Sequence, residues 1–180
     1  KKRKTIISFI NSNRLEDAKS IAEQSLKLNN NSEEVWLVAL TFAKLNNSLI
    51  KFSEFQMLNN KKELKIINYV FYDNNKIQEN HEVIAERFFN LVQADDTSNK
   101  NYNDLNNNQD NIDYFLFYLN LSLILKPQFD EALFIKAQIY QELKIYLKAE
   151  EIYKKIHPEH YLYVEGQKNI VIIKKNTKKF

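Results

Sequence analysis

"PQFDEALFIKAQIYQELKIYLKAEEIY", residues 127–153, alternates small and large side chains at regular distances. Ala137 is followed three residues later by Tyr140, and Ala149 is followed four residues later by Tyr153. Apolar residues within the stretch recur at intervals of three and four, which indicates helix rather than strand. The stretch therefore predicts two helices whose small and large residues share a common packing pattern.

The same helical periodicity extends through the rest of the chain, and no segment shows the strict alternation of a strand. The chain has one glycine and two prolines. Asparagine-rich segments supply the breaks instead, because asparagine caps helices and tolerates left-handed backbone. The sequence thus predicts an all-α fold. The predicted helices cover residues 3–11, 14–28, 33–46, 48–58, 62–70, 80–94, 111–125, 129–142, 145–156 and 159–173.

The composition is that of one folded domain spanning residues 1–180, since 44% of the residues are apolar and 13% are aromatic. The net charge is +3, from 26 basic and 23 acidic residues. This balance does not favour a nucleic-acid or membrane-surface partner. The basic excess lies in "KKRK" and "KKNTKK" near the two ends, which we expect to be solvated. The lack of cysteine excludes disulfides and thiolate chemistry.

No targeting or membrane segment is visible in the sequence. No apolar run approaches the ~20 residues that a membrane-spanning helix needs. The start lacks the long apolar region and the cleavage site of a signal peptide. It also lacks an initiator methionine, so we expect a fragment of a longer protein, and the compartment, cytoplasm or periplasm, stays open.

Residues 94–110, "ADDTSNKNYNDLNNNQD", are polar and rich in asparagine. Such a composition buries too little apolar surface to fold by itself. We predict a flexible insertion between the two helices of one hairpin, with a binding loop as the alternative.

The spacing of Pro127, Ala137, Tyr140, Ala149 and Tyr153 resembles the tetratricopeptide repeat, a 34-residue helix-turn-helix. The resemblance covers roughly two thirds of the chain, and bacterial proteins of this class are the most similar. It implies a superhelix, that is, a solenoid of four to five antiparallel helix hairpins. In this pattern the alanines lie where two helices cross, and a larger side chain would push them apart.

Further units follow on either side of this one. Residues 81–92 and 113–127 resemble the two helices of the preceding unit, and residues 13–47 resemble another unit near the N-terminus. The only glycine, Gly166, stands at the small position of the last unit. The resemblance implies packing roles for Ala18, Trp36, Ala85, Ala137, Tyr140, Ala149, Tyr153 and Gly166.

"HPEH", residues 157–160, is the only cluster that hints at a metal site. A metal needs three or four converging ligands, and the third histidine, His81, is distant in sequence from His157 and His160. A turn with proline at the first helical position is the simpler interpretation. The chain has no glycine-rich phosphate loop and no hydrolase or metalloprotease motif. We therefore expect no catalytic residues, no metal, no cofactor and no enzymatic activity.

The resemblance implies that the concave wall of the superhelix binds a protein or peptide partner. Glu131 and Ile135 stand where chaperone-binding members carry polar and basic residues that clamp a carboxylate, so capture of an acidic C-terminal tail is not expected. The alternatives are a structural segment of a larger solenoid or assembly and, with less support, an RNA-binding helical repeat. We expect no small-molecule substrate. The implied concave residues are Leu37, Thr41, Lys44, Glu131, Phe134, Gln138, Gln141, His160, Tyr163 and Gln167.

Overall fold

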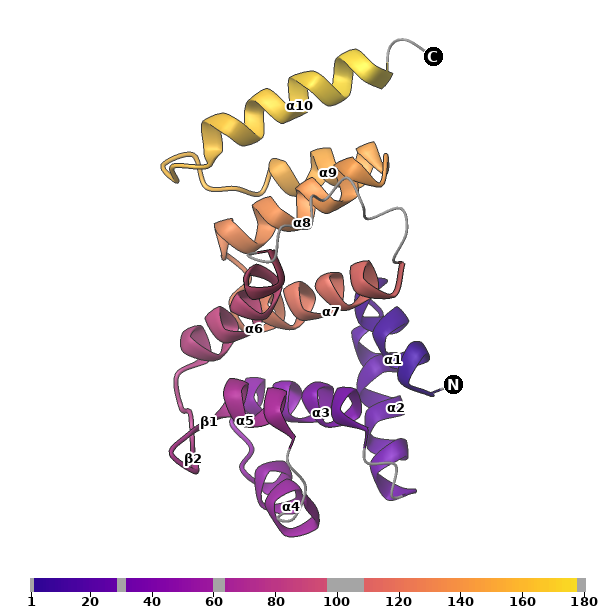
Figure 1. The fold of residues 1–180 in the computed structure, drawn as a ribbon, viewed down its shortest axis with the longest axis vertical. Helices are drawn as coiled ribbons and strands as arrows, with labels where there is room; N and C mark the ends of the chain where they lie inside the picture. The colour runs from indigo at the N-terminus through magenta and orange to yellow at the C-terminus, as the bar shows by residue number, and fades with distance from the viewer. Residues whose placement is uncertain (1, 29–31, 60–63, 97–108, 178–180) are drawn as a thin grey trace.

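The computed structural model describes residues 2–28, 32–59, 64–96 and 109–177. These ranges form ten helices and one short β-hairpin (Figure 1). In chain order the elements are α1 (Lys2–Asn11), α2 (Leu15–Lys27), α3 (Glu33–Leu45), α4 (Ile50–Asn59), α5 (Lys65–Phe71), β1 (Tyr72–Asp73), β2 (Lys76–Ile77), α6 (His81–Asp96), α7 (Gln109–Leu125), α8 (Asp130–Glu142), α9 (Tyr146–Tyr153) and α10 (Tyr163–Thr177).

The predicted all-α class is confirmed, and each predicted helix has a counterpart. The largest shift in boundary is at α10, which was predicted to begin at residue 159 but begins at Tyr163. The amide of His160 donates to the carbonyl of His157 at 2.9 Å, and the amide of Tyr163 donates to the carbonyl of His160 at 2.9 Å. These two bonds form turns before the helix, so α10 begins only at Tyr163. Most of the insertion predicted at 94–110 lies outside the described residues, although α6 continues to Asp96.

The prediction that no strand forms was wrong for a single short hairpin. Tyr72 pairs with Ile77 and Asp73 pairs with Lys76 in an antiparallel ladder. Asn74 and Asn75 join the strands with φ values of 46° and 66°. Two consecutive residues with positive φ make the tightest hairpin turn, and asparagine tolerates this conformation better than most residues. The two-residue strands are too short for alternation to be visible in sequence.

Helices α6 to α10 form a stack along the long axis of the molecule (Figure 1). α6 packs along α7, α8 packs along α9, and α10 packs on α9. Ala137 of α8 and Ala149 of α9 are fully buried, so the two backbones can approach closely. At the α6–α7 contact the Ser122 hydroxyl donates to the carbonyl of Ala85 at 2.8 Å, and both residues are buried.

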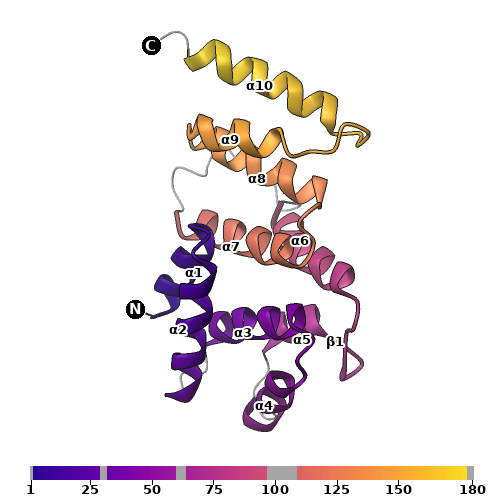
Figure 2. The same ribbon diagram turned by 180° about the vertical axis from the view of Figure 1, so that it is seen from behind.

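The N-terminal helices depart from this simple stack. α2 lies along the long axis, while α3 lies across it (Figure 1). α1 packs on α2 and α3 but also on α7, and Figure 2 shows α1 in front of α7. In a regular solenoid each repeat contacts only its neighbours. The contact between α1 and α7, which are far apart in the chain, is therefore not expected from a simple repeat pattern.

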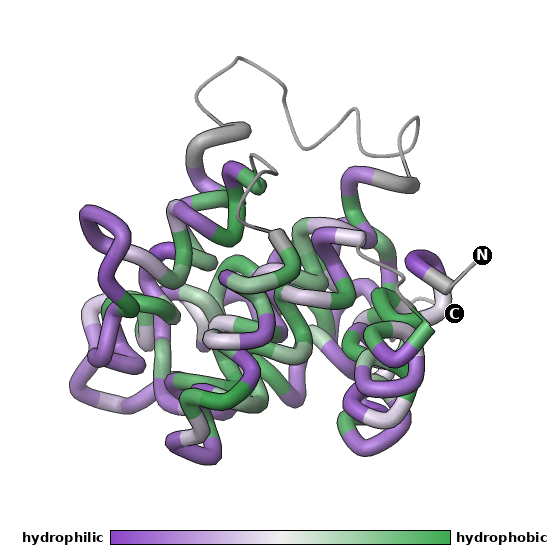
Figure 3. Tube along the Cα trace, turned by 90° about the horizontal axis from the view of Figure 1, so that it is seen from below, coloured by the Kyte–Doolittle hydropathy of each residue, from purple (hydrophilic) through white to green (hydrophobic). Residues whose placement is uncertain are grey.

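One hydrophobic core runs through the described helices. In Figure 3 many of the hydrophobic segments, drawn in green, lie towards the middle of the molecule. Aromatic rings join α4, α5 and α6 within it. Phe52 lies edge to face with Phe71 at 5.7 Å between ring centroids, and Phe71 lies edge to face with Phe88 at 5.7 Å. Such pairs add to the free energy gained from buried area. No helix within the described ranges is long and apolar enough to cross a membrane.

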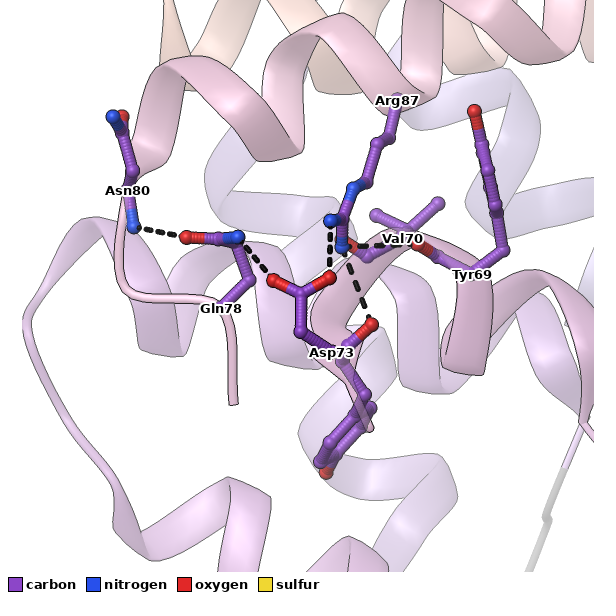
Figure 4. A network of polar contacts seen from close by, with 7 residues as sticks. Tyr69, Val70, Asp73, Gln78, Asn80 and Arg87 are labelled. Atoms are coloured by element: carbon purple, nitrogen blue, oxygen red, sulfur yellow. Dashed lines mark hydrogen bonds and ion pairs between the residues drawn. The ribbon is translucent and has the colours of Figure 1, made fainter. Parts of the chain in front are cut away.

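Arg87 of α6 fastens the end of α5 and the start of the β-hairpin (Figure 4). Its Nη1 donates to the carbonyl oxygens of Tyr69 at 3.2 Å and Tyr72 at 3.3 Å, and to that of Val70 at 3.4 Å. Its Nη2 forms an ion pair with Asp73. The last carbonyls of a helix have no partner within the helix, so this guanidinium satisfies groups that would otherwise remain open. The network is a structural clamp that joins α5 to α6.

Candidate functional site

Three of the predicted concave residues lie in the interior of the N-terminal half. Leu37 and Thr41 are fully buried, and Lys44 is almost so. They belong to α3, which packs against α1, α2, α4, α5 and α7 and is buried along its length from Glu34 to Lys44. These three residues are therefore core residues, and their assignment to a partner-binding surface is corrected. The signal was present in "VWLVAL", since a helix that is apolar all round is a buried helix.

Phe134 is also buried rather than open to a groove. Its ring lies 5.6 Å from that of Tyr153, edge to face, inside the α8–α9 hairpin. The prediction gave this residue a contact with a partner, and the packing instead gives it a contact across the hairpin. An aromatic side chain at a helical interval is most stable where its whole ring is removed from water.

Glu131, Gln141 and His160 make contacts within the chain. His160 Nε2 lies 3.2 Å from Glu131 Oε1, which joins the segment before α10 to the start of α8. Gln141 Oε1 accepts a hydrogen bond from the Tyr153 hydroxyl at 3.0 Å. The structure thus brings His160, which precedes α10, next to Glu131 of α8. The side-chain oxygens of Glu131 and Gln141 named above already have partners within the chain.

Gln138, Tyr163 and Gln167 complete the predicted concave residues and lie on α8 and α10. Gln138 is exposed, and the two residues of α10 are half-buried. Tyr163 and Gln167 are four residues apart on α10, so they share one face of the helix. We call these three residues the amide face.

All eight residues with predicted packing roles are buried. They are Ala18, Trp36, Ala85, Ala137, Tyr140, Ala149, Tyr153 and Gly166.

The "HPEH" segment forms the turn between α9 and α10. The amide of His157 donates to Asp130 Oδ1 at 3.0 Å, and the amide of Glu159 donates to His157 Nδ1 at 3.3 Å. Gln128 Nε2 also donates to Asp130 Oδ1, at 2.7 Å. Asp130 therefore ties the turn to the start of α8. In the part of the chain that the structure describes, no three histidine or acidic side chains converge on a possible metal position.

A pocket that the sequence did not predict lies between α1 and α7, with a volume of about 380 Å³. It joins residues more than a hundred positions apart in the chain, so no local pattern could reveal it. We call it the α1–α7 pocket. Its lining residues are Arg3, Lys4, Ile7, Ser8, Asn11, Ser12, Asp113 and Tyr114.

Glu34 of α3 contacts two residues that line this pocket, Arg3 and Tyr114. Its Oε1 accepts a hydrogen bond from the Tyr114 hydroxyl at 2.9 Å and lies 2.8 Å from Nε of Arg3. The Arg3 guanidinium also contacts the Tyr114 hydroxyl and lies over the ring. Nearby, burial raises the pKa of Tyr118 to about 12, and the negative charges of Glu34 and Glu33 act in the same direction. One buried carboxylate thus connects α1, α3 and α7.

A chain of side-chain hydrogen bonds reaches the pocket and crosses three helices. Asn11 Nδ2 of α1 donates to the carbonyl of Asp113 at 2.9 Å. Asn120 Nδ2 of α7 donates to Asn11 Oδ1 at 3.1 Å. Lys136 Nζ of α8 donates to Asn120 Oδ1 at 2.6 Å. Every bond runs in the same direction, from the lysine towards the backbone carbonyl, so the dipoles reinforce one another.

Lys136, the donor that starts this chain of bonds, has a lowered pKa. Burial, together with the positive charges of Lys155 and Lys148, lowers its pKa from 10.5 to about 8. Lys148 reaches over α8, since its Nζ lies 5.4 Å from the centre of the Tyr140 ring. The described residues place no carboxylate against Lys136. The site therefore carries positive charge that no carboxylate of the described residues neutralises.

Comparisons of the chain with protein-family models, with curated proteins and with solved structures found no match.

Proposed function

We propose that the chain is a non-enzymatic, tetratricopeptide-like protein-interaction module that binds an extended segment of a partner protein across α8 and α10. The observation that carries the proposal is the amide face, in which Gln138 is exposed and Tyr163 and Gln167 are half-buried. The stacked helices α6 to α10 give this face a rigid support, as helical-repeat binding surfaces require.

The chemistry of the amide face suits a peptide backbone. Each glutamine amide supplies both a donor and an acceptor, which match the carbonyl and amide groups of an extended chain. The ring of Tyr163 offers apolar area with a polar tip, a combination enriched where proteins bind one another. The face carries no net charge, which favours a peptide over RNA, because RNA binding depends on a basic surface.

The two helices that carry the amide face are fixed relative to each other by named contacts. His160, which precedes α10, pairs with Glu131 of α8 at 3.2 Å. The Tyr153 hydroxyl donates to Gln141 of α8 and accepts from Asn169 of α10 at 3.1 Å. A preformed surface binds with less loss of conformational entropy than a mobile one, so these contacts support recognition by α8 and α10 together.

The test is a selection of binding peptides from a random-sequence display library with the purified chain. The selected peptides are then measured against a variant that combines Gln138→Ala with Gln167→Ala. We expect their dissociation constants to rise at least about fivefold, because amide hydrogen bonds to the peptide are lost. The matched control is Gln24→Ala, an exposed glutamine of α2 that lies outside the face. Equal affinity for the double variant and the control would contradict the proposal.

A second function, a structural segment of a larger helical assembly, is favoured by the outer side of α10. Val164, Val171 and Ile172 are 63%, 51% and 46% exposed there. Apolar side chains grouped on one helix often mark a contact with another protein surface. Analytical ultracentrifugation of the chain and of a Val171→Glu variant separates the two functions. Concentration-dependent association that the variant abolishes would favour the structural function, and a monomer in both cases would favour the amide face.

A further inference from the structure

Three lysines of α8, α9 and the segment after α9 lie close enough for their charges to interact. Lys136 is partly buried in α8, and the charges of Lys148 and Lys155 act on it. Lys136 and Tyr140 are four residues apart and share a face of α8, and Lys148 lies over the Tyr140 ring. We call Lys136, Lys148 and Lys155 the three-lysine cluster.

Three lysines of the described ranges show the usual arrangement, in which a carboxylate lies beside the ammonium group. Lys51 lies 2.7 Å from Glu54, Lys154 lies 2.7 Å from Glu150, and Lys168 lies 3.3 Å from Glu165. These three ion pairs are between neighbouring turns of a helix. The ammonium group of Lys136 instead bonds to the neutral side-chain amide of Asn120, although Lys136 is buried enough for its pKa to be lowered. A buried cation without an anion is costly, so it is rarely found where it serves packing alone.

The ammonium group of Lys136 has hydrogen-bonding capacity to spare. It carries three N–H donors, and the structure shows one of them used, in the 2.6 Å bond to Asn120 Oδ1. Asn120 is itself held by its bond to Asn11, so the ammonium has a fixed position before any ligand arrives. A cation held in a fixed position with unused N–H donors can form short, charge-assisted hydrogen bonds to an anion.

We propose that Lys136 binds an oxyanion, a carboxylate or a phosphate group, in a site to which Lys148 and Lys155 add positive charge. The anion would accept hydrogen bonds from the free N–H groups of Lys136 and would remove the repulsion within the three-lysine cluster. Lys136 and Gln138 are two residues apart, so they point to nearly opposite sides of α8. The oxyanion site is therefore separate from the amide face and does not depend on the proposed function.

The test compares the thermal unfolding of the purified chain in malonate, in phosphate and in chloride at matched ionic strength. We expect malonate or phosphate to raise the unfolding temperature above that in chloride, because a ligand that binds the folded state stabilises it. Lys136→Met keeps the length of the side chain but removes the charge. Its affinity for the oxyanion should fall at least about tenfold, as expected when a hydrogen bond to a charged group is lost.

The matched control is Lys168→Met, which removes an exposed lysine of α10 that pairs with Glu165. This variant should respond to the oxyanions as the wild type does. An equal response of the wild type and Lys136→Met, or no response of the wild type to either oxyanion, would overturn the proposal.

A second measurement does not depend on a variant that folds. Lysines are acylated with an amine-reactive reagent, and the modified peptides are quantified by mass spectrometry with and without malonate or phosphate. The oxyanion should protect Lys136 while leaving Lys168 unchanged, and a lack of protection at Lys136 would contradict the site. A hexaglutamate peptide used in the same assay distinguishes the sources of the anion. Stronger protection by the peptide than by malonate assigns a carboxylate on a protein chain, and weaker protection assigns a free ion.

Discussion

Gly166 of α10 lies directly against the ring of Tyr153 of α9. A Cβ added to Gly166 would stand 3.4 Å from Tyr153 Cδ1 and 3.4 Å from Ile156 Cδ1. These distances are those of ordinary contact, so the helices leave room for one methyl group and little more. The only glycine of the chain is therefore a place where α10 and α9 come close, but the backbone there does not require glycine.

Gly166→Ala should stabilise the protein. The methyl group fits without displacing Tyr153, and alanine favours helix over glycine by up to ~1 kcal/mol. Gly166→Leu should destabilise it, because the larger side chain would push α10 away from Tyr153 and Ile156. Urea unfolding of the two variants measures both effects, and a loss of stability in Gly166→Ala would show that α9 and α10 leave no room for a methyl group.

Tyr153→Phe should lower the free energy of unfolding by about 1–2 kcal/mol. The hydroxyl donates to Gln141 and accepts from Asn169, so its removal leaves two polar groups without their partner, while the ring packing is kept. Burial also raises the pKa of Tyr153, consistent with a neutral hydroxyl held in the interior. Tyr161→Phe is the control, because Tyr161 is 73% exposed and should change stability little. Equal effects of the two changes would contradict the bridge between α8 and α10.

Lys136 should make stability rise with pH in the alkaline range. Its pKa in the folded protein is lowered to about 8, below the value of about 10.4 expected in the unfolded chain. Below pH 8 both states are protonated and the cost of the buried charge is fully present. As the pH rises from about 8 to about 10.4, the folded protein releases its proton first, and the cost is relieved.

Urea unfolding of the wild type and Lys136→Met at about pH 7.5 and about pH 9.5 isolates this effect. The stability of the variant relative to the wild type should fall by roughly 2 kcal/mol between the two pH values, since each pKa unit corresponds to about 1.4 kcal/mol. Other lysines and tyrosines titrate in both proteins and cancel in the comparison. A difference that does not change with pH would mean that Lys136 keeps an ordinary pKa.

Arg87→Met should loosen the end of α5 and the β-hairpin. The change removes the donors to three backbone carbonyls and the partner of Asp73, for a loss on the order of 2 kcal/mol. Hydrogen exchange should increase in residues 65–77 while α8 and α9 stay protected. Arg14→Met is the matched control, since Arg14 pairs with nearby Asp17 and lies over the Phe9 ring, away from α5 and the β-hairpin. Uniform exchange across the protein would indicate global unfolding instead of a local clamp.

The elements that depend on local pattern were predictable from the sequence. The recurrence of apolar residues every three or four positions identifies the helices. The regular spacing of small residues predicts the packing positions of Ala137 and Ala149, which are buried. The turn of the β-hairpin was missed because Asn74 and Asn75 read equally well as a break between helices. Pattern alone does not distinguish the two uses of asparagine.

The candidate sites were less predictable, because they depend on which helices meet. The sequence cannot indicate that Asn11 contacts Asn120 and, through it, Lys136, since the three residues belong to helices far apart in the chain. The same limit explains the wrong assignment of Leu37. Repeat spacing places it on the inner face of a hairpin, but the unpredicted contacts of α1 and α7 with α3 bury that face.

Hydrogen exchange of the chain with and without a peptide from the display selection most directly tests the proposed binding of a partner by α8 and α10. Amides in residues 130–142 and 163–177 should exchange more slowly when the peptide is bound, whereas those of α2 should be unchanged. Protection confined to α1–α5, or no protection in α8 and α10, would contradict the amide face as the binding surface.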